Sequence, residues 1–390
     1  MMRVAILFDN FGPYHTARML GASAHLDVVA VEAAPSGTEY AWDKPAVPAP
    51  LHYLPLAGTG SLREIITELD AKLAPLRIDA IALPGWSSRA AFAALIWARQ
   101  HKIPAILMSE TNGWDFVRKP FAEWVKRRIV AHYSAGLVTS DSQAQYLAEL
   151  GLADAAIFRG YNAVDNAYFA RAAAAATMPT GLPGTIRGRY FLTSNRFIPK
   201  KNLARLLDAY AAFRQGRSDD PTDWPLVLLG DGELRAALET QRHALGLEAH
   251  VLMPGFRQID ELPHFYGTAG GFVHASTTEQ WGLVVNEAMA SGLPVAVSNR
   301  CGCAEVLVED GVTGLLFDPL DTAAITHALT RLTNHDTAAA LTAAGQERVG
   351  AWGPGRFGNG MAQAAHVAAA EAARPSVLDR ATLDLVARRR

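Results

Sequence analysis

The chain has 390 residues, half of them apolar, and a formal net charge of -2. This length predicts two domains, each with a sizeable core, and the near-neutral charge gives no indication of a nucleic-acid partner. The only two cysteines, Cys301 and Cys303, are too few for a structural zinc site and too close for a good disulfide, so a reducing cytoplasm fits best.

The chain start, Met1 to Asp9, indicates a short strand and not a signal peptide. The longest apolar stretch covers only residues 90–98, whereas a membrane span needs roughly 20 residues. Any membrane contact is therefore expected to be peripheral.

Short apolar runs alternate with helical patterns through the N-terminal part of the chain. Buried runs without strict alternation favour a parallel sheet covered on both faces, which is a doubly wound α/β domain. The predicted strands are 4–8, 28–31, 78–83, 105–108 and 136–139, and the predicted helices include 61–73, 90–101 and 121–132.

A stretch of alanines broken by Pro and Gly then interrupts this pattern. It predicts a linker over 171–186 that separates a first domain, 1–170, from a second α/β domain, 187–351. The strands expected in the second domain are 190–194, 226–229, 250–253, 271–274, 294–297 and 315–317.

The most informative segment of the second domain carries two glutamates eight residues apart, Glu279 and Glu287. A helix is predicted over 283–291, so Glu279 precedes its start and Glu287 lies about one turn inside it. Gly282 permits close approach of a ligand, and the free N–H groups at a helix start favour an anion. One short segment thus offers two carboxylates for sugar hydroxyls and a cradle for phosphate, the groups that a nucleotide-sugar presents.

Two further segments follow the first predicted strand of each domain. In the second domain, Arg196 and Lys201 offer two cations that would stabilise the negative charge on a departing phosphate. In the first domain, the loop after the strand contains Gly12, where a ligand can approach closely, and His15.

Together, the Glu-x7-Glu segment, the Arg-x4-Lys pair and the Gly-containing loop resemble the retaining family-4 glycosyltransferases of GT-B fold. The resemblance runs in order from about Arg3 to Phe357 and is closer in the C-terminal half. It implies two Rossmann-like domains facing across a cleft, with the donor in the second and the acceptor in the first. It also implies that a final helix, within about 352–390, returns to the first domain.

The resemblance further implies an activity: metal-independent transfer of a sugar, with retention, from a nucleoside diphosphate sugar to an acceptor hydroxyl. We expect UDP in preference to GDP, and no cofactor. The expected acceptor is a carbohydrate or lipid-linked oligosaccharide of the cell envelope or an exopolysaccharide, or alternatively a small metabolite.

The family's functional positions carry over to this chain as follows. Arg196 and Lys201 would contact the donor diphosphate, Glu279 the hydroxyls of the transferred sugar, and Glu287 the ribose. His15 is expected to face the cleft and is counted, with Arg196, Lys201, Glu110 and Glu279, among the catalytic candidates. The other positions expected to bind the donor are Gly12, Arg257, Gly282, Leu283 and Val284.

The chain departs from the family where many relatives place a cleft histidine, after the strand 105–108. Here the position falls on Ser109, Glu110 or Thr111. Glu110 could contact the donor sugar, act as a base toward the acceptor, or be a loop acid.

The predicted helix 121–132 is basic and carries Phe121 and Trp124, a pattern that suits either peripheral contact with anionic lipid or a solvated helix with one buried face. Three other classes remain open at this stage: an enzyme using phosphate or a sugar-phosphate as second substrate, a nucleotide-sugar epimerase, and a non-catalytic nucleotide-sugar-binding subunit.

Overall fold

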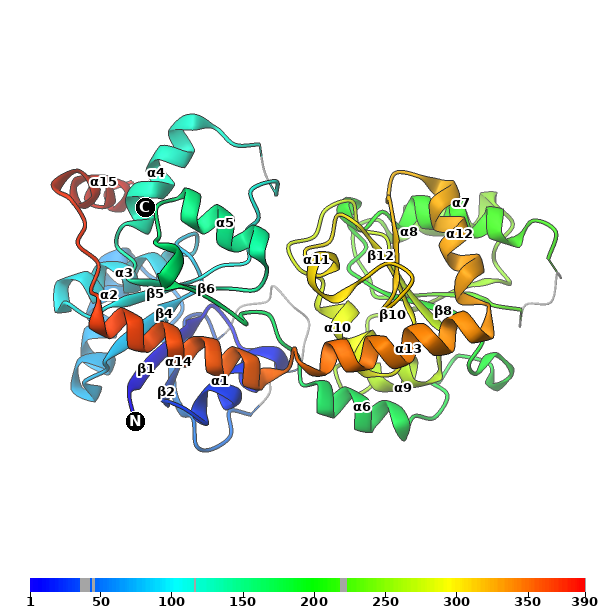
Figure 1. Ribbon diagram of the computed structural model, residues 1–390, viewed down its shortest axis with the longest axis horizontal. Coiled ribbons are helices and arrows are strands. Elements are labelled where there is room, and N and C mark those ends of the chain that lie inside the picture. Colours follow the sequence, from blue (N-terminus) through cyan, green and yellow to red (C-terminus); the bar gives the residue numbers. More distant parts are fainter. Residues whose placement is uncertain (36–42, 44–45, 116, 218–222, 390) are drawn as a thin grey trace. The chain divides into compact units, whose positions relative to one another are not determined.

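The computed structural model describes residues 1–35, 43, 46–115, 117–217 and 223–389. The chain folds as two compact units. Unit 1 comprises residues 1–164 and 353–390, and unit 2 comprises residues 165–352. Each unit is a parallel sheet with helices on both faces, which confirms the expected α/β architecture of two Rossmann-like domains (Figure 1).

Unit 1 is built on seven parallel strands in the order β3-β2-β1-β4-β5-β6-β7. The five strands expected from sequence are all present, and two short strands, β3 and β7, were missed. The strands are β1 (Arg3–Phe8), β2 (Asp27–Glu32), β3 (His52–Pro55), β4 (Ala80–Leu83), β5 (Ala105–Met108), β6 (Ala135–Val138) and β7 (Ile157–Arg159).

Alternate residues of the central strands serve two separate cores, which is why these strands show no polar face. On one side of the sheet, Leu7 and Ile81 belong to the core formed with α2 and α3; on the other, Ile6 and Ala82 belong to the core formed with α1 and α14. The helices of unit 1 are α1 (Pro13–Ser23), α2 (Leu62–Leu73), α3 (Arg89–His101), α4 (Pro120–Val130), α5 (Asp141–Glu149), α14 (Pro354–Ala370) and α15 (Val377–Ala387).

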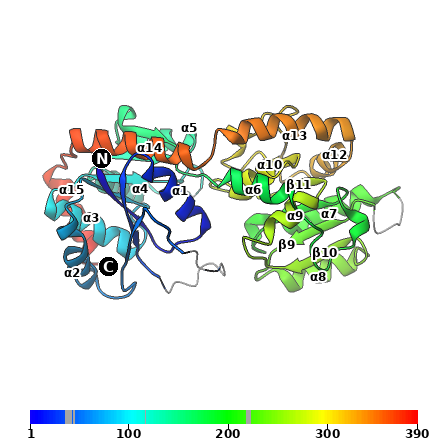
Figure 2. The same ribbon diagram turned by 90° about the horizontal axis from the view of Figure 1, so that it is seen from below.

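Helix α14 belongs to unit 1, where it lies along α1 (Figures 1 and 2). The two helices meet at glycines: a Cβ on Gly21 would lie 2.1 Å from the Pro354 carbonyl oxygen, and a Cβ on Gly358 would lie 2.1 Å from the Gly21 carbonyl oxygen. Beyond it, α15 is a docked helix and no frayed tail, because Leu383 is buried and Asp379 pairs with Arg128 of α4 at 3.1 Å.

Unit 2 is built on six parallel strands in the order β10-β9-β8-β11-β12-β13. All six were expected from sequence: β8 (Phe191–Ser194), β9 (Leu226–Leu229), β10 (Val251–Gly255), β11 (Gly271–His274), β12 (Val295–Ser298) and β13 (Leu315–Phe317). The helices are α6 (Asn166–Ala174), α7 (Leu203–Arg214), α8 (Arg235–Ala244), α9 (Leu262–Thr268), α10 (Leu283–Ala290), α11 (Ala304–Leu307), α12 (Thr322–Leu332) and α13 (His335–Gly350).

The boundary between the units lies earlier than the linker expected over 171–186. The chain leaves unit 1 after Val164, and α6 already packs in unit 2 against α9 and α10. Its alanines form a helix because Asp165 caps the first turn by accepting a hydrogen bond from the Tyr168 N–H at 2.8 Å.

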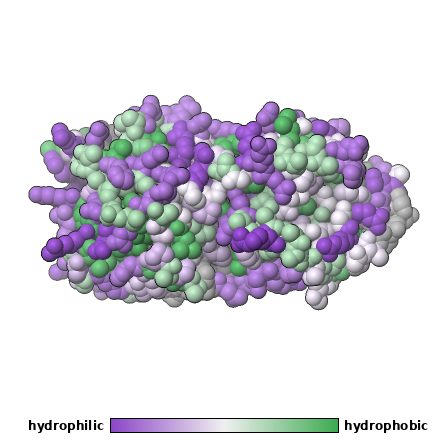
Figure 3. All heavy atoms as spheres, turned by 60° about the horizontal axis from the view of Figure 1, so that its bottom comes forward, coloured by the Kyte–Doolittle hydropathy of each residue, from purple (hydrophilic) through white to green (hydrophobic). Residues whose placement is uncertain are grey.

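Over the described residues, no helix has both the length and the apolar character required to cross a membrane. The face drawn in Figure 3 shows hydrophilic side chains interspersed with hydrophobic ones, as is common on folded proteins.

Candidate functional site

The strand order of unit 2 reverses between β8 and β11, so the loops after these two strands diverge at the carboxyl edge of the sheet. In doubly wound sheets this point is where ligands bind. The loop after β8 carries Arg196 and Lys201, and the loop after β11 carries Glu279. The residues singled out from sequence therefore lie on both sides of the topological switch point.

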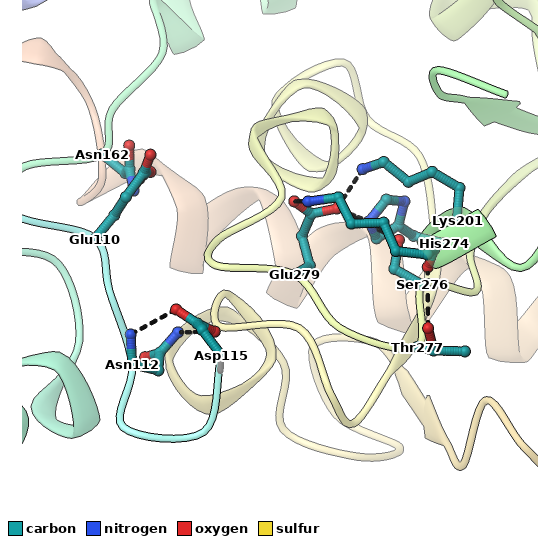
Figure 4. Close-up of polar contacts among 10 residues, drawn as sticks. Glu110, Asn112, Asp115, Asn162, Lys201, His274, Ser276, Thr277 and Glu279 are labelled. Carbon is teal, nitrogen blue, oxygen red and sulfur yellow. Dashed lines mark hydrogen bonds and ion pairs between the residues drawn. The ribbon is translucent and has the colours of Figure 1, made fainter. Parts of the chain in front are cut away.

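The carboxylate of Glu279 is the centre of a cluster of charges (Figure 4). Its Oε2 forms an ion pair with Lys201 Nζ, and its Oε1 lies 3.4 Å from Lys200 Nζ. Oε2 also lies 3.8 Å from His274 Nε2 and accepts a hydrogen bond from Ser276 Oγ at 3.4 Å. Lys201 and Glu279 were assigned different donor groups from sequence, and here they bind each other.

Burial alone would raise the pKa of Glu279, but contact with His274 and the positive charge of Lys201 outweigh it, and the pKa lies well below its usual range. The pKa of His274 is lowered, chiefly because the ring is completely buried. An ionised Glu279 thus lies beside a neutral His274.

The start of α10 adjoins this cluster. Gly282 caps the helix with φ +105°, a backbone conformation that residues with a Cβ rarely adopt. A Cβ at this position would lie 3.3 Å from Cys303 Sγ and 3.6 Å from His274 Nε2. The N–H groups of Leu283 and Val284 fall in the first helical turn, where backbone donors have no partner within the helix.

Glu287 lies inside α10 as expected, but it is only 1 % exposed. Its Oε2 accepts a hydrogen bond from the Tyr266 hydroxyl of α9 at 2.8 Å. Its contact with the ribose stays a prediction, and the geometry shows a buried acid that links α10 to α9.

Arg196 is exposed in the loop after β8, and the shape of this loop depends on Gly230 and Gly232 in the loop after β9. A Cβ on Gly230 would lie 1.9 Å from the Asn195 carbonyl oxygen, and a Cβ on Gly232 would lie 2.7 Å from the Phe197 carbonyl oxygen. The glycines are required because the two loops touch backbone to backbone.

Arg257 follows β10 at the same edge of the sheet. Its Nε lies 3.5 Å from Glu261 Oε1, its Nη1 donates to the Phe256 carbonyl at 3.0 Å, and its guanidinium lies over the Phe265 ring at 5.9 Å. The structure therefore shows a locally packed arginine, and its contact with the donor stays a prediction.

In unit 1, His15 lies in the first turn of α1 with its ring 4.4 Å from that of Phe8. Its Nδ1 accepts a hydrogen bond from the Gly12 N–H at 3.0 Å, so this nitrogen carries no proton. Burial, with a smaller contribution from the charge of Arg18, lowers the pKa of His15 to about 3. The histidine thus has a definite structural function in shaping the Gly12 loop, and a site role would use its other nitrogen.

Glu110 follows β5 and is held by a chain of polar groups, of which Figure 4 shows Asn162. Its Oε2 accepts a hydrogen bond from Asn162 Nδ2 at 3.0 Å, and Asn162 Oδ1 accepts one from Arg18 Nη2 at 3.0 Å. Because Arg18 can only donate, the amide orientation of Asn162 is fixed and its NH2 group must face Glu110. Gln143 Nε2 donates to the Glu110 carbonyl at 3.0 Å.

Four of these neighbours were missed in the sequence: His274 and Ser276 beside Glu279, and Asn162 and Arg18 behind Glu110. Each is buried, with Arg18 the most exposed at 3 %. A polar residue at the end of a strand, as in Val273-His274, was a usable signal for the first pair. Asn162 and Arg18 lie 144 positions apart, so no local pattern could have joined them.

Cys301 and Cys303 are free, buried thiols in a tight turn, as expected. Among residues with described positions, no group of three or more His, Cys, Asp or Glu side chains could hold a metal ion. Transfer without a metal ion stays a prediction.

Comparison with known proteins defines the class. Residues 186–348 match the family model of glycosyl transferases group 1, and residues 13–159 match that of the glycosyl transferase 4-like domain. The chain belongs to this family of GT-B glycosyltransferases, as the sequence resemblance implied.

Among curated relatives, the GDP-mannose-dependent alpha-(1-6)-phosphatidylinositol monomannoside mannosyltransferase of Mycobacterium tuberculosis is 32% identical over 163 residues, 40% of this chain and 41% of the relative. The alpha-D-kanosaminyltransferase of Streptomyces kanamyceticus is 25% identical over 263 residues, 63% of this chain and 65% of the relative. In both cases the match spans less than two thirds of the relative's length.

Solved structures share the fold over nearly the whole chain. Anabaena HepE, in complex with UDP and glucose, superposes with a TM-score of 0.69 at 19% identity, covering 93% of this chain and 99% of HepE. Sucrose-phosphate synthase from Thermosynechococcus elongatus gives a TM-score of 0.70 at 20% identity, covering 93% and 98%.

Proposed function

We propose that this protein transfers a sugar from a nucleoside diphosphate sugar to an acceptor hydroxyl, with retention of configuration and without a metal ion. The observation that carries the proposal is the cluster in unit 2, where Lys201, Glu279 and the start of α10 combine a cation, a carboxylate and free backbone N–H groups. A nucleoside diphosphate sugar needs each of these groups, because it presents phosphates beside sugar hydroxyls.

The chemistry explains why cations are needed. When the bond between the anomeric carbon and the β-phosphate oxygen breaks, its electron pair stays on that oxygen and adds negative charge to the phosphate. Arg196, Lys201 and the first turn of α10 would stabilise this charge, with each hydrogen bond to a charged group contributing roughly 1.5–3 kcal/mol. In this proposal, these groups stabilise the negative charge that other enzymes stabilise with a metal ion.

In the proposed transfer, the acceptor oxygen bonds to the anomeric carbon on the face that the phosphate leaves, and the acceptor's proton passes to the leaving phosphate. Glu279 would accept hydrogen bonds from hydroxyls of the transferred sugar. Retention is taken from the family resemblance, since no carboxylate nucleophile is assigned. Glu110 is proposed to face a substrate hydroxyl from unit 1.

We favour UDP over GDP as the nucleotide, supported by the UDP complex of HepE, although the mycobacterial relative is named as GDP-mannose-dependent. A cell-envelope or exopolysaccharide acceptor is proposed first. The kanosaminyltransferase relative favours a small metabolite as the alternative acceptor. A non-catalytic subunit would bind the same donor without turnover.

The test is thermal unfolding with UDP, GDP, UDP-glucose and GDP-mannose, each with and without EDTA. At a concentration of 100 times Kd, binding should raise the melting temperature by roughly 5–10 °C. We expect a shift that is insensitive to EDTA, lost in Arg196→Ala and kept in Arg189→Ala, an exposed arginine at the other end of β8. No shift with any of the four compounds, in folded protein, would overturn the proposal and the binding-subunit alternative together.

We further propose a cytoplasmic protein that touches the inner face of the membrane through α4. Phe121 is 75 % exposed and stacks on the partly exposed Trp124, and Val117 just before the helix is 89 % exposed. Arg127 on the same helix is also exposed, and apolar side chains beside basic ones suit an anionic lipid surface. Sedimentation with phosphatidylglycerol vesicles, compared with phosphatidylcholine vesicles, tests this; equal recovery of wild type and Phe121→Ser would refute it.

A further inference from the structure

His274 and Ser276 lie beside Glu279, and the function proposed above uses neither of them. His274 is the last residue of β11, Ser276 follows two positions later, and both are completely buried. Buried polar groups are costly unless they are bonded, so their presence at the centre of the candidate donor site requires an explanation.

The three side chains form a directed chain of hydrogen bonds. Ser276 Oγ donates to Glu279 Oε2 at 3.4 Å, so the hydroxyl is left to accept from His274 Nε2, which lies 3.2 Å away. This direction requires a proton on Nε2 of His274. The lowered pKa of His274 agrees with a neutral ring, and Nδ1, the nitrogen left bare, has no hydrogen-bond partner among the described residues.

This chain of hydrogen bonds becomes the main support of the Glu279 carboxylate when a donor binds. In the structure, Lys201 forms an ion pair with Glu279. A diphosphate would draw Lys201 to itself, and Glu279 would then lose the cation that now holds it. His274 is part of β11 and Ser276 lies in the loop directly after it, so both stay in contact with Glu279. Because His274 Nε2 also lies next to Gly282, the chain reaches the start of α10.

We propose that His274, acting through Ser276, is a positioning residue that holds the Glu279 carboxylate in place for the sugar of the donor. The inference rests on the proposed function, because it assumes that Glu279 binds the transferred sugar. It predicts a specific defect: loss of His274 weakens recognition of the sugar and leaves recognition of the nucleotide intact.

The competing explanation is that His274 only fills space, since its ring lies nearly parallel to that of Phe272 with 6.4 Å between centroids. A space-filling role would be served better by Phe, which has no unpaired nitrogen. His274→Phe is therefore a discriminating variant: if packing were the only role, it would leave donor binding unchanged.

Isothermal titration of UDP and UDP-glucose, and of GDP and GDP-mannose, measures the ratio of the two dissociation constants in each pair. For the pair that binds, we expect His274→Phe and Ser276→Ala to bind the nucleotide within about twofold of wild type. Their affinity for the sugar nucleotide should fall roughly 10- to 100-fold, since a hydrogen-bonded support of a charged group is lost. His274→Gln, whose amide N–H can replace Nε2–H, should restore most of the ratio.

Thr313→Ala serves as the control, because Thr313 is buried in unit 2 and its hydroxyl bonds to the Glu309 N–H and the Leu307 carbonyl. It should lower stability and leave the ratio unchanged. An unchanged ratio in His274→Phe, or equal weakening of nucleotide and sugar nucleotide, overturns the inference. Wild-type protein that binds none of the four compounds overturns the proposed function instead.

Discussion

Replacing Gly230 with alanine tests whether the loops around the donor site depend on direct backbone contact. Gly230 has φ +127°, and an added Cβ would lie 1.9 Å from the Asn195 carbonyl oxygen and 3.0 Å from its carbon. Carbon and oxygen do not approach this closely, so the loop after β8 must move by about 1 Å or more. That loop carries Arg196 and Lys201.

Two contributions determine how much Gly230→Ala lowers the free energy of unfolding. A left-handed conformation costs a residue with a Cβ about 1–2 kcal/mol, and an overpacked contact costs about 1–3 kcal/mol. Gly230→Ala should therefore lower the free energy of unfolding by about 2–5 kcal/mol. Because Arg196 and Lys201, the proposed phosphate ligands, shift with the loop, nucleotide affinity should fall at least roughly tenfold, in line with the sensitivity of sites to displacements of about 1 Å.

Gly246→Ala isolates the backbone contribution. Gly246 has φ +66° in the turn after α8, and a Cβ there would meet no atom within 4 Å. Gly246→Ala should lower the free energy of unfolding by about 1–2 kcal/mol and leave nucleotide affinity unchanged. Urea unfolding and titration with UDP and GDP measure both quantities, and the reasoning fails if the two variants behave alike.

Three further outcomes are expected. The pKa of His15 is lowered to about 3 in the folded state, so the stability that His15 contributes is present above about pH 6.5 and lost as the pH falls from 6.5 toward 3. In urea unfolding, His15→Asn should therefore lose less stability between pH 6.5 and 3 than wild type does. An equal loss in both proteins would contradict the lowered pKa of His15. Asn162→Ala should lower the free energy of unfolding by about 1.5–3 kcal/mol, because it removes buried hydrogen bonds to Glu110 and Arg18. A loss below about 0.5 kcal/mol in urea titration would show that these hydrogen bonds contribute little to stability. Lys201→Met should weaken nucleotide binding at least roughly tenfold by calorimetry. Lys200→Met should weaken it less, because the Lys200 side chain is more exposed. If Lys200→Met has the larger effect, Lys200 is the phosphate ligand.

The architecture was predictable because parallel sheets leave a strong signal. Strands buried on both faces appear as continuous apolar runs, so 105–108, 226–229, 271–274 and 315–317 were predicted to the residue. The missed strands, β3 and β7, lie at the two edges of the sheet in unit 1 and are short. Edge strands are partly exposed, as Tyr53 in β3 shows, and their composition resembles that of loops.

The candidate site was predictable only in part, because sequence spacing locates chemical groups but not their partners. The positions of Lys201 and Glu279 at the carboxyl ends of β8 and β11 follow from topology once the strands are known. Their ion pair does not, since it depends on loop conformation. The burial of Glu287 against Tyr266 was also beyond local pattern, because the partner lies on another helix.

The loops at the carboxyl edge of unit 2 are linked in series by their backbones. The Phe197 N–H donates to the Asp231 carbonyl at 2.8 Å, and the Thr277 N–H donates to the Lys200 carbonyl at 2.8 Å. The Gly302 N–H then donates to the Glu279 carbonyl at 2.9 Å, so four loops from four strands form one connected unit.

This linkage explains why glycine stands at positions 230 and 302 in these loops. A Cβ on Gly302 would lie 2.0 Å from the Gln280 carbonyl oxygen, just as one on Gly230 would meet Asn195. A side chain at either position would separate loops that carry the charged groups. Backbone contacts thus position the groups proposed to bind the donor before any ligand arrives, which lowers the entropy lost on binding. For the same reason, substitutions that touch no ligand, at Gly230 or Gly302, should affect the donor site as strongly as substitutions of the charged residues themselves.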